Sequence, residues 1–293
     1  RSTDNGASWE NVSPSGIDNF LTGVAFGNDT FLGVTYGAWT IWRSTDNGAT
    51  FIAVAPPELY GGSHVVHRLG GITFGNKTFV AVGLDDSVGN VGVVIRSTDN
   101  GDTWDNVTTF PTVQGFRGVG FGNNTFVAVG NGGNIVRSTD NGTTWDNATS
   151  PTDEDFWGVG FGNNTFVAVG TNGTIVRSTD NGSSWNNETS GTSLDMYGVT
   201  YGNNTFVAVG EIGNIRTSSD GSSWTHRTKP QSYNLMGATF GNNTFVAVGY
   251  NGSVVRSTDN GTSWDDRTSA SGITTNIRGV TFGNNTFVAV GSN

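Results

Sequence analysis

One nine-residue phrase recurs along the chain of 293 residues and constrains its fold more than any other feature. It reads RSTDNGTTW at 137–145, RSTDNGSSW at 177–185 and RSTDNGTSW at 256–264. Its aspartate recurs at intervals of 39–42 residues, with one longer interval of 53, at Asp4, Asp46, Asp99, Asp140, Asp180, Asp220 and Asp259. A repeat of this period is typical of folds that copy one supersecondary unit many times.

A second phrase, FGNNTFVAVG at 121–130 and 161–170, alternates with the first and also occurs seven times with small variations. The unit at 117–148 predicts four short strands joined by Asn-Asn and Asp-Asn-Gly turns. Its second strand, 125–130, is apolar on both faces, which indicates that both faces of the sheet are covered. We therefore predict an all-β fold, a seven-bladed β-propeller of four-stranded antiparallel blades.

We expect a single domain over residues 1–293, closed by pairing of the N- and C-terminal strands so that no long sheet edge is left free. The predicted blades are approximately 22–55, 70–108, 117–148, 157–188, 197–227, 236–267, and 278–293 together with 1–12. The last blade is about four residues short in its third strand. We therefore also expect the natural chain to continue before Arg1, within a longer polypeptide or a surface assembly.

The pattern Ser-x-Asp-x-Gly-x-x-Trp in the first phrase resembles the Asp box, or BNR repeat, of sialidases, sortilin-like receptors and photosystem II assembly factor-like propellers. The resemblance covers essentially the whole chain. It implies a propeller but no single function, because such propellers include enzymes, receptors and scaffolds. The residue types favour a structural role for the phrase, since its aspartate can accept backbone N–H bonds and Trp145 can seal the hairpin. Two copies depart from the pattern: Phe51 replaces the tryptophan, and the copy at 217–224 is one residue short.

Charge and composition exclude several kinds of partner. The formal net charge of −10 disfavours nucleic acid, which needs a basic face. The chain has no run of 18 apolar residues, so we expect no direct membrane insertion. It has no cysteine, and His64 and His67 form its only close histidine pair, fewer ligands than a metal site needs. We therefore predict neither a metal nor a cofactor.

Differences between the copies locate the predicted binding site. The turns within the two phrases are nearly uniform, whereas the connections between units, such as 149–156 and 228–235, vary strongly. We predict that the ligand binds on the variable face, around the mouth of the central channel, through Arg117, Trp157, Tyr197, Arg278, Met236, Tyr233 and Tyr60. Drift in unconstrained loops explains the same variation equally well.

Asn-x-Ser/Thr motifs are abundant and suggest a glycosylated surface protein. The candidates are Asn123, Asn147, Asn163, Asn187, Asn203, Asn242 and Asn284. Asparagine-rich turns beside threonine-rich strands generate such motifs without any function. We nevertheless expect an extracellular or cell-surface binding, adhesion or scaffold protein that recognises a glycan or a protein.

The alternative function is a glycoside hydrolase, sialidase-like or of another Asp-box type. Arg68, Arg117 and Arg278 would then contact an anionic sugar, with Tyr197 as nucleophile and Asp153, Glu154 or Asp155 as acid. This enzyme would need a defined pair of carboxyl groups, and no pair stands out. The sequence therefore favours binding without catalysis.

Overall fold

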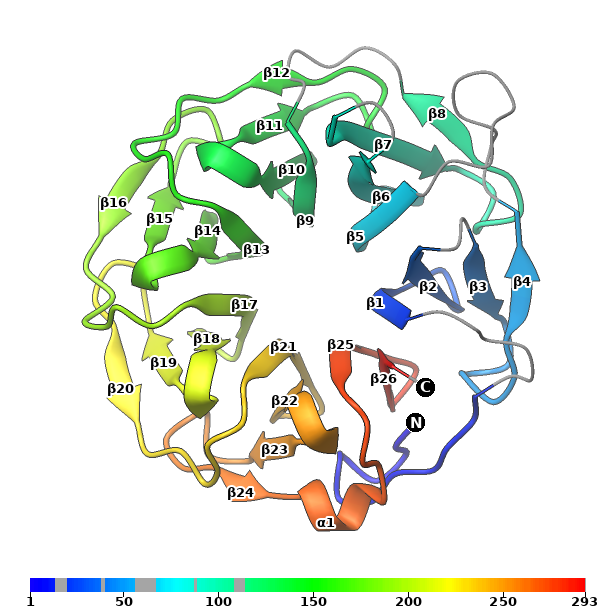
Figure 1. The fold of residues 1–293 in the computed structure, drawn as a ribbon, viewed down its shortest axis with the longest axis vertical. Coiled ribbons are helices and arrows are strands. Elements are labelled where there is room, and N and C mark those ends of the chain that lie inside the picture. The colour runs from blue at the N-terminus through cyan, green and yellow to red at the C-terminus, as the bar shows by residue number, and fades with distance from the viewer. Residues whose placement is uncertain (14–19, 38–39, 56–66, 87–88, 108–113, 293) are drawn as a thin grey trace.

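The computed structural model describes residues 1–13, 20–37, 40–55, 67–86, 89–107 and 114–292. Its short antiparallel strands are arranged around a central opening as in a β-propeller (Figure 1). The chain is therefore all-β, built from repeated four-stranded sheets. The two chain ends lie next to each other in the ring.

Each repeat contributes one strand to the wall of the central opening. These innermost strands are β1 (Phe20–Gly27), β5 (His67–Gly75), β9 (Phe116–Gly122), β13 (Phe156–Gly162), β17 (Met196–Gly202), β21 (Leu235–Gly241) and β25 (Ile277–Gly283). Each of them contacts the innermost strand on either side, and β25 contacts β1, so the row closes on itself.

The second strand of each repeat pairs with the innermost one: β2 (Thr30–Tyr36), β6 (Thr78–Asp85), β10 (Thr125–Gly130), β14 (Thr165–Gly170), β18 (Thr205–Gly210), β22 (Thr244–Gly249) and β26 (Thr286–Gly291). The third strands are β3 (Ile41–Ser44), β7 (Val91–Ser97), β11 (Ile135–Ser138), β15 (Ile175–Ser178), β19 (Ile215–Ser218) and β23 (Val254–Ser257). The outer strands are β4 (Ile52–Val54), β8 (Asp105–Val107), β12 (Asp146–Asn147), β16 (Asn186–Glu188), β20 (Thr225–Arg227) and β24 (Asp265–Asp266).

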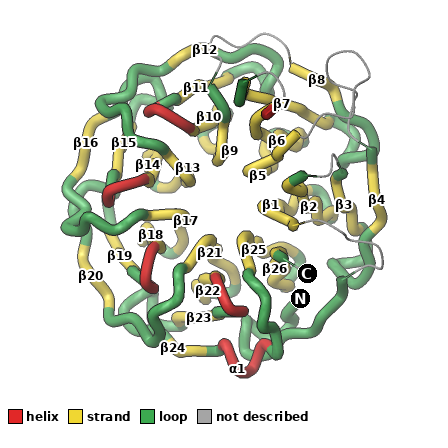
Figure 2. Tube along the Cα trace, viewed as in Figure 1, coloured by secondary structure: helices red, strands yellow, loops and turns green. Residues whose placement is uncertain are grey.

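The helices are short. The 3₁₀ turns η2 (Asn131–Gly133), η3 (Thr171–Gly173), η4 (Glu211–Gly213) and η5 (Tyr250–Gly252) follow the second strands, and α1 (Thr268–Ser271) follows β24 (Figure 2). The sequence analysis did not predict any of them. The outer strands are two or three residues long. At β12, Thr143 N and Thr144 N donate hydrogen bonds to Asp140 in the preceding turn instead of extending the strand.

The sheets differ in two places from a simple set of four-stranded units. Strands β1 to β8 form one eight-stranded sheet, because β5 begins at His67 and Arg68 pairs with Tyr36 at the end of β2. The last sheet contains β25 and β26, and Ser2 pairs with Phe287 on the other side of β26. Two backbone hydrogen bonds thus join the chain ends. Ser2 N donates to Phe287 O and Phe287 N donates to Ser2 O, each at 2.8 Å.

The hydrophobic core lies between neighbouring sheets. Phe126, Val127, Ala128 and Val129 of β10 are all fully buried, although their side chains alternate between the two faces of the strand. Val127 and Val129 pack into a cluster with Phe156, Val159 and Phe166 of the next sheet. Covering both faces in this way explains why the second strand of every repeat is apolar throughout.

Glycines let the innermost strands approach each other closely. A β-carbon at Gly118 would lie 2.9 Å from the carbonyl oxygen of Trp157, and one at Gly158 would lie 2.8 Å from that of Tyr197. The equivalent position Gly23 has more room, since its nearest atom would lie at 3.4 Å. Any larger residue at the tight positions must therefore push two backbones apart.

The repeated phrase closes the turn between the third and outer strands. In the copy at 137–145, the Asp140 carboxylate accepts hydrogen bonds from Ser138 Oγ at 2.8 Å and from Thr144 N and Oγ1 at 2.9 and 2.7 Å. Trp145 Nε1 donates to Gly142 O at 3.1 Å. In the copy at 43–51, the Thr50 hydroxyl and further hydrogen bonds lower the pKa of Asp46 to about 2. All donors and acceptors of this network belong to the same copy of the phrase, so each copy stabilises its own turn.

The phrase also links neighbouring repeats through its first residue. Arg137 Nη1 donates to Asn181 O of the next copy at 3.2 Å, and Arg177 Nε donates to Asp220 O at 2.8 Å. The copy at 217–224 has Thr217 at the position equivalent to Arg137. This copy therefore lacks the arginine that makes the link elsewhere.

The close approach of the inner strands predicts unequal effects of alanine at equivalent glycines. We expect Gly158→Ala to lower the free energy of unfolding by about 1–3 kcal/mol, because the new methyl group overpacks the strand contact. Gly23→Ala is the matched control and should have a clearly smaller effect. Urea unfolding of both variants measures the difference, and equal effects would contradict the proposed role of the glycines.

Candidate functional site

The residues at the channel mouth occupy a repeated irregularity of the innermost strands. In β9, Gly118 pairs with Val129 and Phe116 pairs with Gly130, so Arg117 is the extra residue of a β-bulge. The same register shift leaves Thr22, Gly70, Trp157, Tyr197, Met236 and Arg278 as extra residues in the other innermost strands. A bulge re-aims the side chain it carries. The bulge is thus present in every innermost strand, while the residue at the bulge differs from strand to strand.

Three of the predicted site residues form a row across adjacent strands. The Arg117 guanidinium lies over the Trp157 ring, 3.9 Å from its centroid. The Trp157 and Tyr197 rings meet edge to face, with centroids 5.5 Å apart and planes at 86°. Such contacts combine cation–π and quadrupole attraction. The structure therefore brings Arg117, Trp157 and Tyr197 together into one half-buried surface, which we call the aromatic row.

The Arg117 side chain is held on both sides. Its Nε donates to Asn131 Oδ1 at 2.6 Å, and its Nη2 lies 3.3 Å from Asp155 Oδ2. The other oxygen of Asp155 accepts a hydrogen bond from Gly132 N at 2.8 Å. The carboxylate thus joins β13 to the 3₁₀ turn of the preceding repeat and orients the arginine at the same time.

Acceptors like Asp155 recur, and their role in holding the 3₁₀ turns was not predicted from the sequence. Asp195, Asn234 and Asn276 each accept a hydrogen bond from the backbone N–H at the middle of η3, η4 or η5, at 2.9–3.0 Å. All of them stand two positions before the mouth residue of their strand. This spacing could have identified them from the sequence, because Asp or Asn recurs at this position while the neighbouring residues vary.

Burial, together with the nearby carboxylates of Asp195 and Glu211, raises the pKa of Tyr197 to about 12. Its phenol therefore stays protonated at neutral pH and is available as a hydrogen-bond donor. A tyrosine with a raised pKa is poorly suited to the nucleophilic role that the hydrolase alternative gave it.

The other predicted site residues are spread around the ring. Arg278 lies over Phe20, 5.7 Å from the ring centroid, and no described residue forms an ion pair with it. Met236 is half-buried at the mouth, and Tyr233 is 47% exposed in the connection before β21. Tyr60 lies outside the described residues. Arg68, stacked on Tyr36 at 4.3 Å and paired with Asp86, repeats the arginine–aromatic arrangement elsewhere on the ring.

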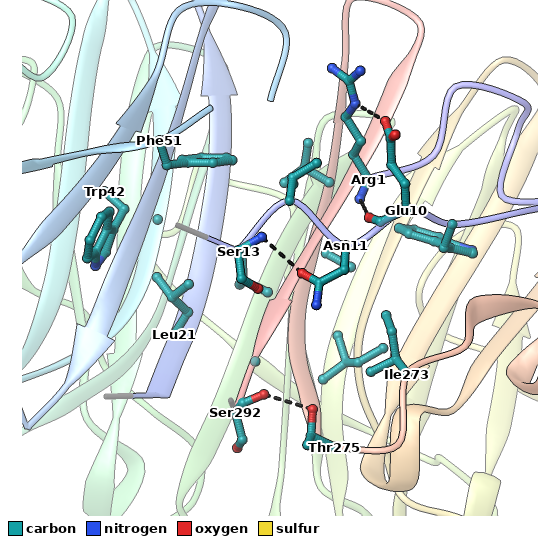
Figure 3. A pocket seen from close by; sticks show the side chains of 18 of the residues that line it. Arg1, Glu10, Asn11, Ser13, Leu21, Trp42, Phe51, Ile273, Thr275 and Ser292 are labelled. Carbon is teal, nitrogen blue, oxygen red and sulfur yellow. Dashed lines mark hydrogen bonds and ion pairs between the residues drawn. The ribbon is translucent and has the colours of Figure 1, made fainter. Parts of the chain in front are cut away.

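A separate cavity lies beside the junction of the chain ends. It has a volume of about 130 Å³ and is lined by Trp9, Leu21, Trp42, Phe51 and Val288 among others (Figure 3). It occupies the space beside β26, where Ser2 provides the only strand pairing on that side among the described residues. The cavity is apolar on the side of β1 to β4 and does not reach the aromatic row.

The described residues hold no group of three or more His, Asp or Glu side chains placed to bind a metal ion. Among these residues, no helix has the length and hydropathy needed to cross a bilayer.

Comparison with known proteins identifies the family. A family model described as "Photosynthesis system II assembly factor YCF48" matches residues 1–293, the entire chain. The chain belongs to the YCF48 family. The resemblance to BNR-repeat propellers is thereby confirmed. Among curated proteins, no sequence matches this chain.

Solved structures support the fold. YCF48 from Cyanidioschyzon merolae has a TM-score of 0.76 and 16% sequence identity, over 98% of this chain and 97% of that chain. A structure titled "YCF48 bound to D1 peptide" has a TM-score of 0.71 and 16% identity, over 97% of this chain and 91% of that chain. The computationally designed Ika8 protein has a TM-score of 0.65 and 12% identity, over 97% and 96%. At these identities the likeness concerns the fold alone.

The YCF48 family corrects the functional prediction. An extracellular or cell-surface adhesion protein is wrong, and so is the glycoside hydrolase, because the matching family is a photosystem II assembly factor. A glycan ligand and a surface assembly have no support in these relatives.

The fold needs asparagine at most of the glycosylation motifs for a reason of its own. Asn123, Asn163, Asn203, Asn242 and Asn284 all have φ between 45° and 48° in the turn between the first two strands. Asparagine tolerates this left-handed conformation better than most residues. Asn147 and Asn187 lie exposed on the outer strands β12 and β16. Turn geometry therefore accounts for five of the seven motifs without a glycan.

The stacking in the aromatic row predicts a measurable coupling between two of its residues. Arg117→Met and Trp157→Leu should be non-additive in unfolding free energy by about 0.5–1 kcal/mol, since each single change already removes the cation–π contact. A double-mutant cycle in urea measures this term. Additive effects within error would mean that the stacking does not stabilise the mouth.

Proposed function

We propose that this YCF48-family protein binds a peptide segment of a photosystem II protein at its channel mouth and is not an enzyme. A relative of the same fold is described as bound to D1 peptide, and D1 is therefore the first candidate partner. The observation that carries the proposal is the aromatic row, in which Arg117, Trp157 and Tyr197 are already packed together at bulged positions. Preorganised Trp, Tyr and Arg side chains are the residue types that dominate binding energy at protein interfaces.

Engagement of Glu154 and Asp155, two of the carboxylates that the hydrolase alternative considered as its acid, supports a binding role over catalysis. Asp155 is bonded to Gly132 N and Arg117, and Glu154 accepts hydrogen bonds from Thr171 and Asn172. An acid or nucleophile of a glycosidase needs a carboxyl group that faces the substrate. Here both groups hold loops and an arginine in place.

We also propose that the ring comprises seven blades, one for each innermost strand, within the single domain predicted over residues 1–293. Two observations support this count. The eight-stranded sheet divides into two groups of four strands that are joined only by the pair Tyr36–Arg68 among the described residues. The pair Ser2–Phe287 stands in the register of Ser138–Phe126, as expected for the third strand of a closing blade.

Peptide binding is testable with a fluorescently labelled D1 peptide, the ligand of the similar structure. Trp157→Ala should weaken binding by about 30-fold or more, the effect of truncating a central aromatic anchor worth about 2 kcal/mol. Ile52→Ala is the matched control, because Ile52 is an apolar residue that is 59% exposed on the outer strand β4. Fluorescence anisotropy measures both. Equal weakening in the two variants, or no binding to the wild type, would contradict the proposal.

A further inference from the structure

We propose that the peptide partner presents an arginine side chain, flanked by apolar residues, to Asp195 and Glu211 beside the aromatic row. This inference rests on the proposed function and specifies the chemistry of the ligand. The protein already holds a guanidinium at the neighbouring position of the ring.

Arg117 provides an internal template. Its guanidinium lies between the ring face of Trp157, the amide oxygen of Asn131 and the carboxylate of Asp155. The two oxygens of Asp155 have separate roles: Oδ1 accepts from Gly132 N at 2.8 Å, and Oδ2 faces Arg117 at 3.3 Å. At this position in the propeller, one carboxylate oxygen binds the 3₁₀ turn and the other faces a cation.

The next position around the ring has the same acceptor without the cation. Asp195 Oδ1 accepts from Asn172 N at 2.9 Å, as Asp155 Oδ1 accepts from Gly132 N. Within the part of the chain that the structure describes, no group donates to Asp195 Oδ2 and no cation pairs with it. The reason is the substitution at the mouth, where Trp157 stands in place of Arg117. One carboxylate oxygen is thus left open.

A second carboxylate belongs to a residue beside Asp195, because Glu211 N donates a hydrogen bond to Asp195 O at 2.9 Å. Glu211 begins η4 at the position that Asn131 occupies in η2, where the side chain bonds to the mouth residue of its own repeat. For Glu211 that mouth residue is Tyr197, and the charges of Glu211 and Asp195 both act on the Tyr197 hydroxyl. Lys229, the nearest cation in sequence, donates to Ile212 O at 2.7 Å instead. Among the described residues, Glu211 has no ion pair.

Apolar side chains flank these carboxylates. Ile212 is 42% exposed and has φ of 54°, whereas Gly132, Asn172 and Asn251 stand at its equivalent positions. A β-branched residue rarely adopts this conformation. Tyr233, 47% exposed, belongs to the connection whose Asn234 accepts the N–H of Ile212. Two exposed apolar residues thus border the open carboxylates.

Charge and geometry together define the occupant. Two unpaired carboxylates on a protein of net charge −10 attract a cationic segment and repel an acidic one. A guanidinium satisfies two separated oxygens through its forked donors and stacks on aromatic rings, as Arg117 does. Arginine therefore fits the site better than lysine, and neighbouring leucine or similar residues fit the border at Ile212 and Tyr233.

The test uses a labelled peptide of sequence acetyl-Gly-Leu-Arg-Leu-Gly-amide and its counterpart with citrulline, the neutral isostere, in place of arginine. Wild-type protein should bind the arginine peptide about tenfold more tightly, as expected for one charge-assisted contact. Asp195→Asn and Glu211→Gln should each remove most of this preference. Asp146→Asn, on the exposed outer strand β12, is the control with the same change in charge.

The preference for arginine and its loss in the two variants would support the assignment. A preference below about twofold, its survival in the Asp195→Asn/Glu211→Gln double variant, or an equal loss in Asp146→Asn would overturn it. The labelled D1 peptide is measured in parallel. If D1 peptide binds through Trp157 without any arginine preference, the proposed function stands and this inference fails. If the arginine preference holds but D1 peptide does not bind, the D1 assignment fails instead.

Discussion

Adjacent innermost strands meet through close backbone contacts at glycine, and these contacts form the wall of the central opening. Carbonyl groups of Trp157 and Tyr197 lie against Gly118 and Gly158, at distances that leave no room for a β-carbon. The residue that precedes each of these glycines is the extra residue of a bulge in its strand. A uniform backbone therefore presents a set of chemically different side chains.

The mouth combines this uniform backbone with local variation in charge. Where the bulge carries Arg117, the neighbouring Asp155 is neutralised within the protein. Where it carries Trp157, the equivalent Asp195 keeps one oxygen without a donor among the described residues. One oxygen of Asp195 thus stabilises the 3₁₀ turn, and the other is the oxygen that we propose for ligand binding. A binding surface can change in this way without any change in the strands that support it.

Much of the fold could be predicted from the sequence, because the same strand-forming and turn-forming residues recur in each copy of the repeat. The second strand at 125–130 and the turns that need positive φ, such as Asn123, follow directly from local residue types. The joining of β2 to β5 could not be predicted, because it depends on one long-range pair, Tyr36 with Arg68. The 3₁₀ turns were missed for a similar reason, since their capping acceptors come from the next repeat.

The sequence placed several candidate residues at equivalent positions of the repeats but did not reveal their contacts. Alignment of the copies located the residues before the shared glycine, including Arg117, Trp157 and Tyr197. It did not reveal that they are bulged or that Asn131 and Asp155 hold the arginine, because these contacts cross between repeats. The predicted cellular context was wrong, because it relied on asparagines followed by threonine that the turns already require at positive φ. Residues that every copy needs for its turns carry no information about the cellular location of the protein.

Hydrogen–deuterium exchange of the protein with and without D1 peptide tests whether the peptide binds at the channel mouth. The account places the ligand over the aromatic row and its supporting turns. It therefore predicts slower exchange on binding in 114–118, 131–134, 155–158 and 195–198, with the turns at 123–124 and 140–144 unchanged. Protection confined to the turns at 123–124 and 140–144, or to the outer strands β12 and β16, would contradict the assignment of the channel mouth as the binding surface.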